Sequence, residues 1–109
     1  MAFKVPKEIS PEQLEERLHQ GETVMMLDVR EPGEWFEGHL PGAKHIPLGA
    51  LPERCEELDR NKEWVVMCRS GGRSGLACEI LHERGFKVVN LTGGLLRWTG
   101  ELSGERESN

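Results

Sequence analysis

Three short, largely apolar runs along the chain predict buried β-strands. They cover Val24–Val29, Trp64–Met67 and Val88–Leu91. Because apolar and polar residues do not alternate within them, each strand is expected to be covered on both faces. A further short strand is expected at Lys44–Ile46.

Helices are expected between these strands, because apolar residues there recur at spacings of three and four. The first begins at Ser10, which can cap a helix entered by Pro11, with Gln13 completing a capping box and Gly21 ending it. Ile9 and Leu14 form the matching hydrophobic staple. Two further helices are predicted from apolar stripes: one from Leu51, Cys55 and Leu58, and one from Leu76, Ala77, Ile80 and Leu81, which ends at Gly85. A short helix is also expected at 95–98, and one helical turn inside the loop 31–42.

The alternation of buried strands with amphipathic helices indicates an α/β fold of three layers. A central, mainly parallel sheet is expected to have helices on both faces. In such sheets, ligands bind beyond the carboxyl ends of the strands. The residues that follow each predicted strand are therefore the first place to look for chemistry.

The length of 109 residues is enough for a single domain. We assign residues 1–100 to it and 101–109 to a flexible C-terminal tail, because the tail has little apolar content. No apolar run approaches the roughly 18 residues needed to cross a bilayer, so no membrane is expected as a partner. The acidic N-terminal segment does not resemble a secretory leader, so the expected compartment is the cytoplasm.

The charge is unevenly distributed. A net charge of −5 argues against nucleic acid as a partner. Residues 60–97 nevertheless carry seven Lys and Arg residues against three Glu residues. This basic segment is either ordinary surface charge or a local field that attracts a small anion.

Cys68 lies in the basic segment, at the carboxyl end of the second predicted strand. Two glycines follow it and can take positive φ, which would turn successive backbone N–H groups toward the sulfur. The next helix would point its positive end at the same place, and two arginines lie within five residues. These features should lower the pKa of Cys68 and make its thiolate a nucleophile. The loop residues are Arg69, Ser70, Gly71, Gly72, Arg73 and Ser74. The alternatives are an inert buried cysteine and unspecialised surface arginines.

Other residues that could take part in chemistry have simpler explanations. Asp28 could act as a general acid, but a buried pair with Arg30 is favoured, and Arg30 could pair with either Asp28 or Glu34. His39 and His45 lack a third ligand at metal-binding spacing, so an ordering role in the loop is favoured. Trp35 and Trp98 are expected in the core or in a pocket wall, and Cys55 in the core. Cys78 falls off the predicted apolar stripe, so partial exposure and, less readily, a role as a resolving thiol are expected.

The order of these motifs resembles the rhodanese family of sulfurtransferases. The residues that carry the resemblance are Leu27-Asp28-Val29-Arg30, Glu34-Trp35, Gly38 to Ala43, His45-Ile46-Pro47, the loop Cys68 to Ser74, and Gly93-Gly94 with Trp98. The resemblance implies the rhodanese-like fold and a single-domain thiosulfate sulfurtransferase. Cys68 would take sulfur from a small anionic donor as a persulfide and pass it to cyanide in the assay, or to a thiol or sulfur-carrier pathway in the cell. It implies no metal and no organic cofactor.

Two other functions stay open at this point. Related phosphatases and arsenate reductases have Cys-x5-Arg loops, but here Arg73 follows Cys68 as Cys-x4-Arg. A loop one residue shorter suits a single sulfur better than a phosphoryl group. A non-catalytic interaction module is the other alternative, and retention of the cysteine argues against it.

Overall fold

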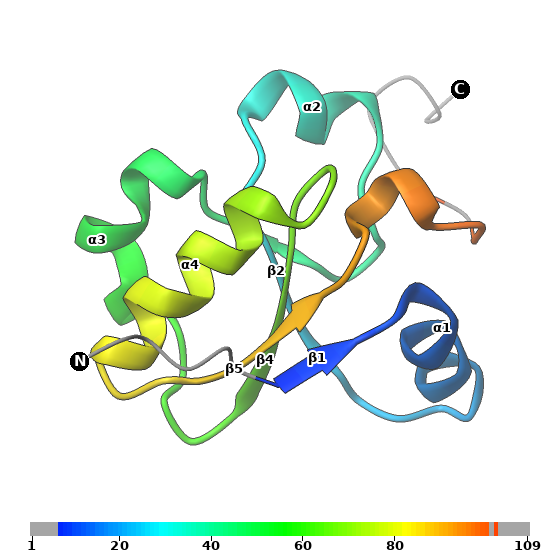
Figure 1. The fold of residues 1–109 in the computed structure, drawn as a ribbon, viewed down its shortest axis with the longest axis horizontal. Helices are drawn as coiled ribbons and strands as arrows, with labels where there is room; N and C mark the ends of the chain where they lie inside the picture. Colours follow the sequence, from blue (N-terminus) through cyan, green and yellow to red (C-terminus); the bar gives the residue numbers. More distant parts are fainter. Residues whose placement is uncertain (1–6, 101, 103–109) are drawn as a thin grey trace.

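Five parallel strands form the centre of the fold (Figure 1). In the computed structural model, which describes residues 7–100 and 102, they lie in the order β1-β5-β4-β2-β3. The strands are β1 (Lys7–Ile9), β2 (Met25–Asp28), β3 (Lys44–His45), β4 (Glu63–Met67) and β5 (Lys87–Leu91). The predicted parallel sheet is confirmed. Strand β1 was not predicted, because only one of its three residues, Ile9, is apolar and buried.

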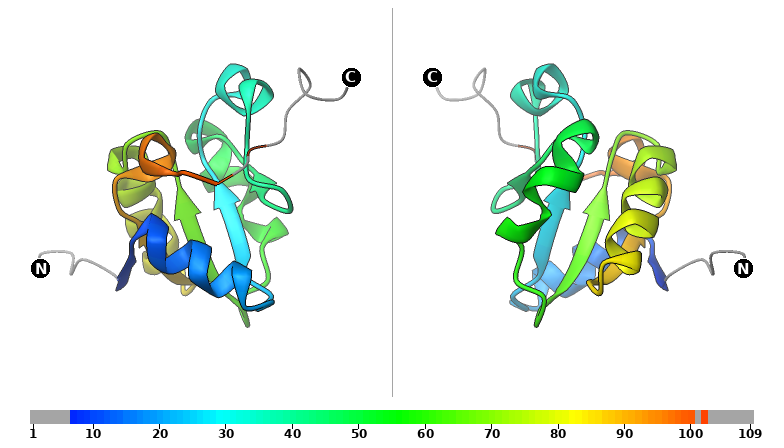
Figure 2. Two further views of the ribbon diagram at one scale, coloured as in Figure 1. Left: turned by 90° about the vertical axis from the view of Figure 1, so that its right-hand side faces the viewer. Right: turned by 90° about the vertical axis from the view of Figure 1, so that its left-hand side faces the viewer.

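Helices cover both faces of the sheet (Figure 2). One face packs against α3 (Leu51–Arg54) and α4 (Gly72–Glu83), and the other packs against α1 (Pro11–His19) and η3 (Gly94–Arg97). The remaining helical segments are α2 (Pro32–Glu37), η1 (Leu48–Ala50) and η2 (Cys55–Glu57). The strands therefore contribute alternate side chains to two separate hydrophobic clusters, as the three-layer prediction requires.

The N-terminus of α1 forms as its sequence predicts. Ser10 Oγ accepts a hydrogen bond from the backbone N–H of Gln13, and the Gln13 side chain accepts one from the backbone N–H of Ser10. Ile9 and Leu14 are both buried in one cluster. The helix ends at His19, and Gly21 follows with a φ of +82°.

The buried face of α4 differs from the predicted stripe. Leu76 is 49% exposed, whereas the buried side chains are those of Ser74, Ala77, Cys78 and Leu81. The prediction that Cys78 is partly exposed is therefore wrong. Ala77 and Leu81 are buried as predicted, but the buried face is rotated from Leu76 toward Ser74 and Cys78. The prediction that Cys55 belongs to the core is confirmed.

Within the described residues, no helix is both long and apolar enough to cross a membrane. Of the predicted tail, residues 101–109, only Leu102 is among the described residues.

Candidate active site

Cys68 is the first residue after β4, at the carboxyl edge of the sheet. Its carbonyl oxygen accepts a hydrogen bond from the backbone N–H of Leu95 at 2.9 Å, and that of Arg69 accepts one from the N–H of Leu96 at 2.9 Å. These bonds fasten the start of the loop to η3. A Cβ atom at Gly94 would lie 2.4 Å from the carbonyl oxygen of Arg69, so this close approach requires glycine.

The loop after Cys68 folds back over the sulfur. The backbone N–H of Gly71 donates to Cys68 Sγ at 3.0 Å, and the sulfur lies 3.4 Å from Ser74 Oγ. Gly71 makes this possible with a φ of +106° immediately before α4 begins. The predicted turn of backbone N–H groups toward the sulfur is present in the structure.

The pKa of Cys68 is lowered by hydrogen bonds that act against burial. Burial is the largest single influence and raises the pKa. The Ser74 side chain and the backbone N–H groups of Ser74, Gly71 and Ser70 together lower it by more, because they stabilise the thiolate. Hydrogen-bond donors within the loop, rather than the two arginines, are thus the dominant cause of the lowered pKa.

Arg73 forms a two-pronged ion pair with Glu34 of α2. Its two terminal nitrogens donate to the two carboxylate oxygens, each at 2.8 Å. The hydrogen bond from Arg73 is the main reason that the pKa of Glu34 falls to about 2. Arg73 therefore ties the loop to α2. In contrast, Arg69 is exposed, and its guanidinium forms no ion pair or hydrogen bond with any described residue.

Asp28 and Arg30 form the buried pair that the sequence favours. Arg30 Nη2 lies 2.7 Å from Asp28 Oδ2 and also donates to the carbonyl oxygen of Gly38 at 2.7 Å. The backbone N–H of Arg30 donates to Asp28 Oδ1 at 3.0 Å. Of the two partners considered for Arg30, the structure selects Asp28. A carboxylate that is so fully hydrogen-bonded to its neighbours orders the segment after β2.

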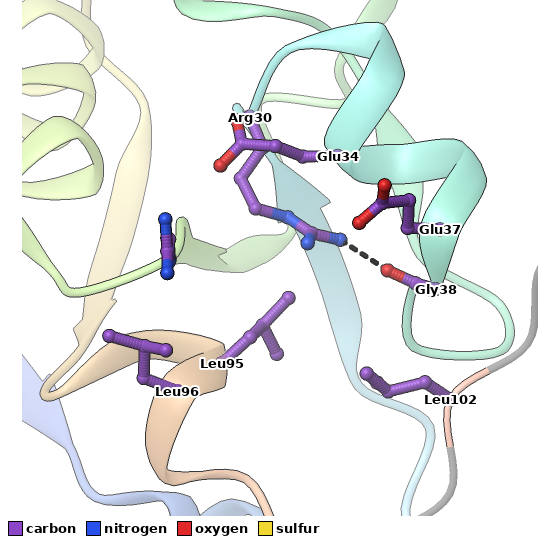
Figure 3. A pocket seen from close by; sticks show the side chains of 8 residues that line it. Arg30, Glu34, Glu37, Gly38, Leu95, Leu96 and Leu102 are labelled. Carbon is purple, nitrogen blue, oxygen red and sulfur yellow. Dashed lines mark hydrogen bonds between the residues drawn. The ribbon is translucent and has the colours of Figure 1, made fainter.

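A pocket of about 370 Å³ opens beside the loop (Figure 3). One wall is polar and includes Arg30 and Glu34, and the facing wall is apolar and includes Leu95 and Leu96. The complete lining is Arg30, Glu34, Glu37, Gly38, Arg69, Leu95, Leu96 and Leu102. Arg69 therefore links the cysteine loop to the pocket.

Comparison with known proteins identifies the family. The profile of the family described as Rhodanese-like domain matches residues 10–101. The chain belongs to this family. The protein named "Putative sulfurtransferase YtwF" of Bacillus subtilis is 48% identical over 95 residues, covering 87% of this chain and 92% of that protein. "Putative sulfur carrier protein YrkF" of the same organism is 41% identical over 101 residues, covering 92% of this chain and 54% of that protein.

Solved structures agree with the family assignment. A crystal structure of a rhodanese-like domain protein from Staphylococcus aureus superposes with a TM-score of 0.85 at 31% identity, covering 91% of this chain and 98% of that one. The rhodanese-like fold predicted from the motifs is thereby confirmed.

The histidines of this rhodanese-like domain order the loop around Trp35. His39 Nδ1 lies 2.8 Å from the carbonyl oxygen of Trp35, and His45 Nε2 lies 2.8 Å from that of Arg30. Both imidazoles stack on the Trp35 indole, with ring centroids 3.5 and 4.7 Å away. Among residues 7–100 and 102, no three His, Cys, Asp or Glu side chains are grouped as a metal site requires.

The structure adds residues to the site that the sequence did not single out. Leu95 and Leu96 form the apolar wall of the pocket, and the preceding Gly93-Gly94 pair was the available signal for a close approach there. Asn90 accepts a hydrogen bond from Ser74 Oγ at 2.6 Å. Its position in a largely apolar strand gave no signal beyond a polar residue in a buried run.

Proposed function

We propose that this chain is a thiosulfate sulfurtransferase in which Cys68 carries sulfur as a persulfide. Sulfur transfer in general is supported by membership of the rhodanese-like family and by the relative named as a sulfurtransferase. The observation that carries the proposal is the ring of hydrogen-bond donors that lowers the pKa of Cys68. A thiolate is the form of cysteine that attacks sulfur.

The cycle has two displacements at sulfur. The Cys68 thiolate attacks the outer sulfur of thiosulfate, an S–S bond forms to Cys68 Sγ, and the S–S bond of thiosulfate breaks with its electron pair leaving on sulfite. Cyanide then attacks the outer sulfur of the persulfide, thiocyanate forms, and the thiolate is restored. In the cell, a thiol or a sulfur-carrier protein would replace cyanide. Each displacement is balanced, so neither an external oxidant nor a metal is required.

The loop would stabilise the Cys68 thiolate and bind the anionic sulfur donor. The N–H of Gly71 and the hydroxyl of Ser74 would stabilise the negative charge of the thiolate. Arg69 would hold the anionic donor, because among the loop arginines it is the one without an ion pair in the described residues. Cys68 is fully buried, so a donor can reach the sulfur only when the loop residues above it move apart.

The decisive experiment is the intact mass of the protein after incubation with thiosulfate. We expect a gain of one sulfur atom, which cyanide then removes. The Cys68→Ser variant is the matched control and should gain no sulfur. A wild-type protein that gains none, while turning over an aryl phosphate, would replace this proposal with the phosphatase alternative. A protein that does neither would be an interaction module.

The loop length offers a second test against the phosphatase alternative. Inserting one glycine between Gly72 and Arg73 gives the Cys-x5-Arg spacing and widens the ring of N–H groups. Sulfur transfer should fall about a hundredfold, because misplacing a catalytic group by about 1 Å has effects of that size. If the widened loop transferred sulfur at the wild-type rate, loop size would not select the chemistry.

A further inference from the structure

Asn90 is a polar side chain near the nucleophile that the proposed cycle leaves without a role. It lies on β5, in register with Val66 of β4. Its Oδ1 accepts a hydrogen bond from Ser74 Oγ at 2.6 Å, and its Nδ2 lies 3.5 Å from the carbonyl oxygen of Gly71. Ser74 in turn lies beside Cys68, so a chain of hydrogen bonds runs from the sulfur to β5.

The Ser74 hydroxyl has one proton and three acceptors within reach. These are Asn90 Oδ1 at 2.6 Å, the carbonyl oxygen of Gly71 at 3.1 Å and Cys68 Sγ at 3.4 Å. A hydroxyl donates only one hydrogen bond at a time. The sulfur and Asn90 therefore compete for the same proton, and Asn90 has the shortest contact.

The direction of the chain depends on the charge of the sulfur. When Cys68 is a thiol, its S–H can donate to Ser74 Oγ, and the Ser74 hydroxyl donates to Asn90 Oδ1. When Cys68 is a thiolate, the Ser74 hydroxyl must turn toward the sulfur and leave Asn90. The short Ser74–Asn90 contact thus favours the thiol, and its release accompanies formation of the thiolate.

We propose that Asn90 is a positioning residue that holds the Ser74 hydroxyl away from the sulfur and thereby sets the pH at which Cys68 becomes a thiolate. The consequence for catalysis rests on the proposed function, but the effect on ionisation does not. The other charged and titratable groups around Cys68 include Arg69, which is the next residue in the chain, and Arg73 and Cys78, which interact with it electrostatically. Glu34 pairs with Arg73, and the Asp28–Arg30 pair lies at the end of the neighbouring strand β2. All of them stay unchanged in the variants below.

The experiment is a pH titration of the ultraviolet absorbance of the Cys68 thiolate. Each variant is measured as a difference from the same protein carrying Cys68→Ser, which removes the contribution of the other cysteines and needs no reagent to enter the buried site. Asn90→Leu has a side chain of similar size with no acceptor. We expect its titration midpoint to fall by about half a pH unit to one unit, a gain in thiolate of about threefold to tenfold at a pH below both midpoints.

Asn90→Asp should have the opposite effect. A carboxylate accepts the Ser74 proton more strongly than an amide and places a negative charge near the sulfur, so the midpoint should rise by about one unit or more. Asn61→Asp is the matched control, because Asn61 is exposed and remote from the loop, and its midpoint should equal that of the wild type. Circular dichroism establishes that each variant is folded.

Ser74→Ala separates the hydrogen-bond chain from a general effect of the substitution. In this background, Asn90→Leu should no longer move the midpoint, and the shift caused by Asn90→Asp should shrink to the effect of its charge. The proposal is overturned if Asn90→Leu leaves the midpoint unchanged or raises it, or if its shift persists in the Ser74→Ala background. If Asn90→Leu does not fold, an Asn90→Asp shift that is undiminished by Ser74→Ala overturns it equally.

The titration also keeps this inference separate from the proposed function. A wild-type protein that gains no sulfur from thiosulfate would overturn the sulfur-transfer cycle and leave the titration result intact. Normal sulfur transfer together with unmoved midpoints would overturn the role of Asn90 alone.

Discussion

Two segments leave neighbouring strands at the same edge of the sheet, and they differ in what their polar groups bind. Where β2 ends, Asp28 and Arg30 bind each other, and Arg30 also binds the carbonyl oxygen of Gly38. After β4, the loop directs hydrogen-bond donors at a sulfur atom and leaves Arg69 without an ion pair in the described residues. The buried charges at the end of β2 are paired with each other, whereas backbone N–H groups of the loop after β4 are directed at the sulfur.

This difference indicates which segment supports the fold and which performs the chemistry. A buried charge whose partners are all within the protein has little left to offer a ligand, and removing one partner is costly because the other stays buried. Hydrogen-bond donors around a sulfur cost less to disturb but control its ionisation. Changes after β2 should therefore reduce stability first, and changes after β4 should reduce activity first.

Two of the cysteines show how hydrogen-bond donors change the ionisation of a buried group. Cys68 and Cys78 are both fully buried. Burial raises the pKa of Cys78 to about 12, whereas the hydrogen bonds around Cys68 lower its pKa in spite of burial. Burial alone therefore makes an inert thiol, and this finding argues against Cys78 as a resolving thiol.

The largest expected effect is the loss of sulfur transfer in Cys68→Ser. The rate should fall by about a thousandfold or more, because the variant has no thiolate to attack the donor. The thermal midpoint should stay near that of the wild type. Cys55→Ala and Cys78→Ala are the matched controls and should keep most of the activity while losing some stability. Thiocyanate formation and thermal unfolding are measured on all four proteins, and substantial transfer by Cys68→Ser would contradict the mechanism.

The next largest effect is expected from Arg30→Met, on stability. The substitution leaves the Asp28 carboxylate buried without its charged partner, which should lower the free energy of unfolding by about 3–5 kcal/mol. Urea unfolding measures it. The double variant Asp28→Asn with Arg30→Met should recover part of the loss, because it leaves no unpaired charge. If Arg30→Met were as stable as the wild type but inactive, the segment after β2 would belong to the chemistry.

Arg69→Ala should affect substrate binding with little effect on stability. Losing one charge-assisted contact costs about 1.5–3 kcal/mol, or roughly tenfold to a hundredfold in kcat/KM, and we expect the change mainly in the KM for thiosulfate. Arg97→Ala is a control from the same basic segment. Steady-state kinetics and urea unfolding of both variants test this, and an unchanged KM would mean that Arg69 is surface charge.

The sequence was informative where a local pattern determines the structure. The capping box at Ser10 and Gln13 needs only four residues, and it formed as predicted. The buried strands and the glycines after Cys68 likewise carry their signals within a few positions. The helix face of α4 was predicted only in part: Ala77 and Leu81 are buried as expected, but centring the stripe on Leu76 and Ile80 left out Cys78, which is buried, and included Leu76, which is exposed.

Pairs of residues that are far apart in the chain could not be predicted from the sequence, for a physical reason. Glu34 and Arg73 are 39 positions apart, and Ser74 and Asn90 are 16 apart. The sequence favoured Asp28 as the partner of Arg30 and kept Glu34 as the alternative, but nothing in it linked Glu34 to Arg73. Only the fold brings α2 over the start of α4, which decides that Glu34 pairs with Arg73 (Figure 1).

The smallest expected effect concerns this link between the two segments, and it depends on pH. Arg73 holds the pKa of Glu34 at about 2, below its ordinary value of 4.5, so the pair stabilises the fold fully above about pH 4.5 and loses that contribution as the pH falls toward 2. The side chains are 29% and 36% exposed, so screening by solvent limits the gain to less than about 1 kcal/mol.

Glu34→Gln should therefore be slightly less stable than the wild type at neutral pH, and the gap between them should close as the pH falls from about 4.5 to 2. Urea unfolding across this range measures the gap, and added salt should narrow it at neutral pH. Glu53→Gln, an exposed position on α3, is the control for loss of one negative charge. A gap that widened on acidification would have the wrong sign for a carboxylate with a lowered pKa, and would show that the loop and α2 are not joined through this ion pair.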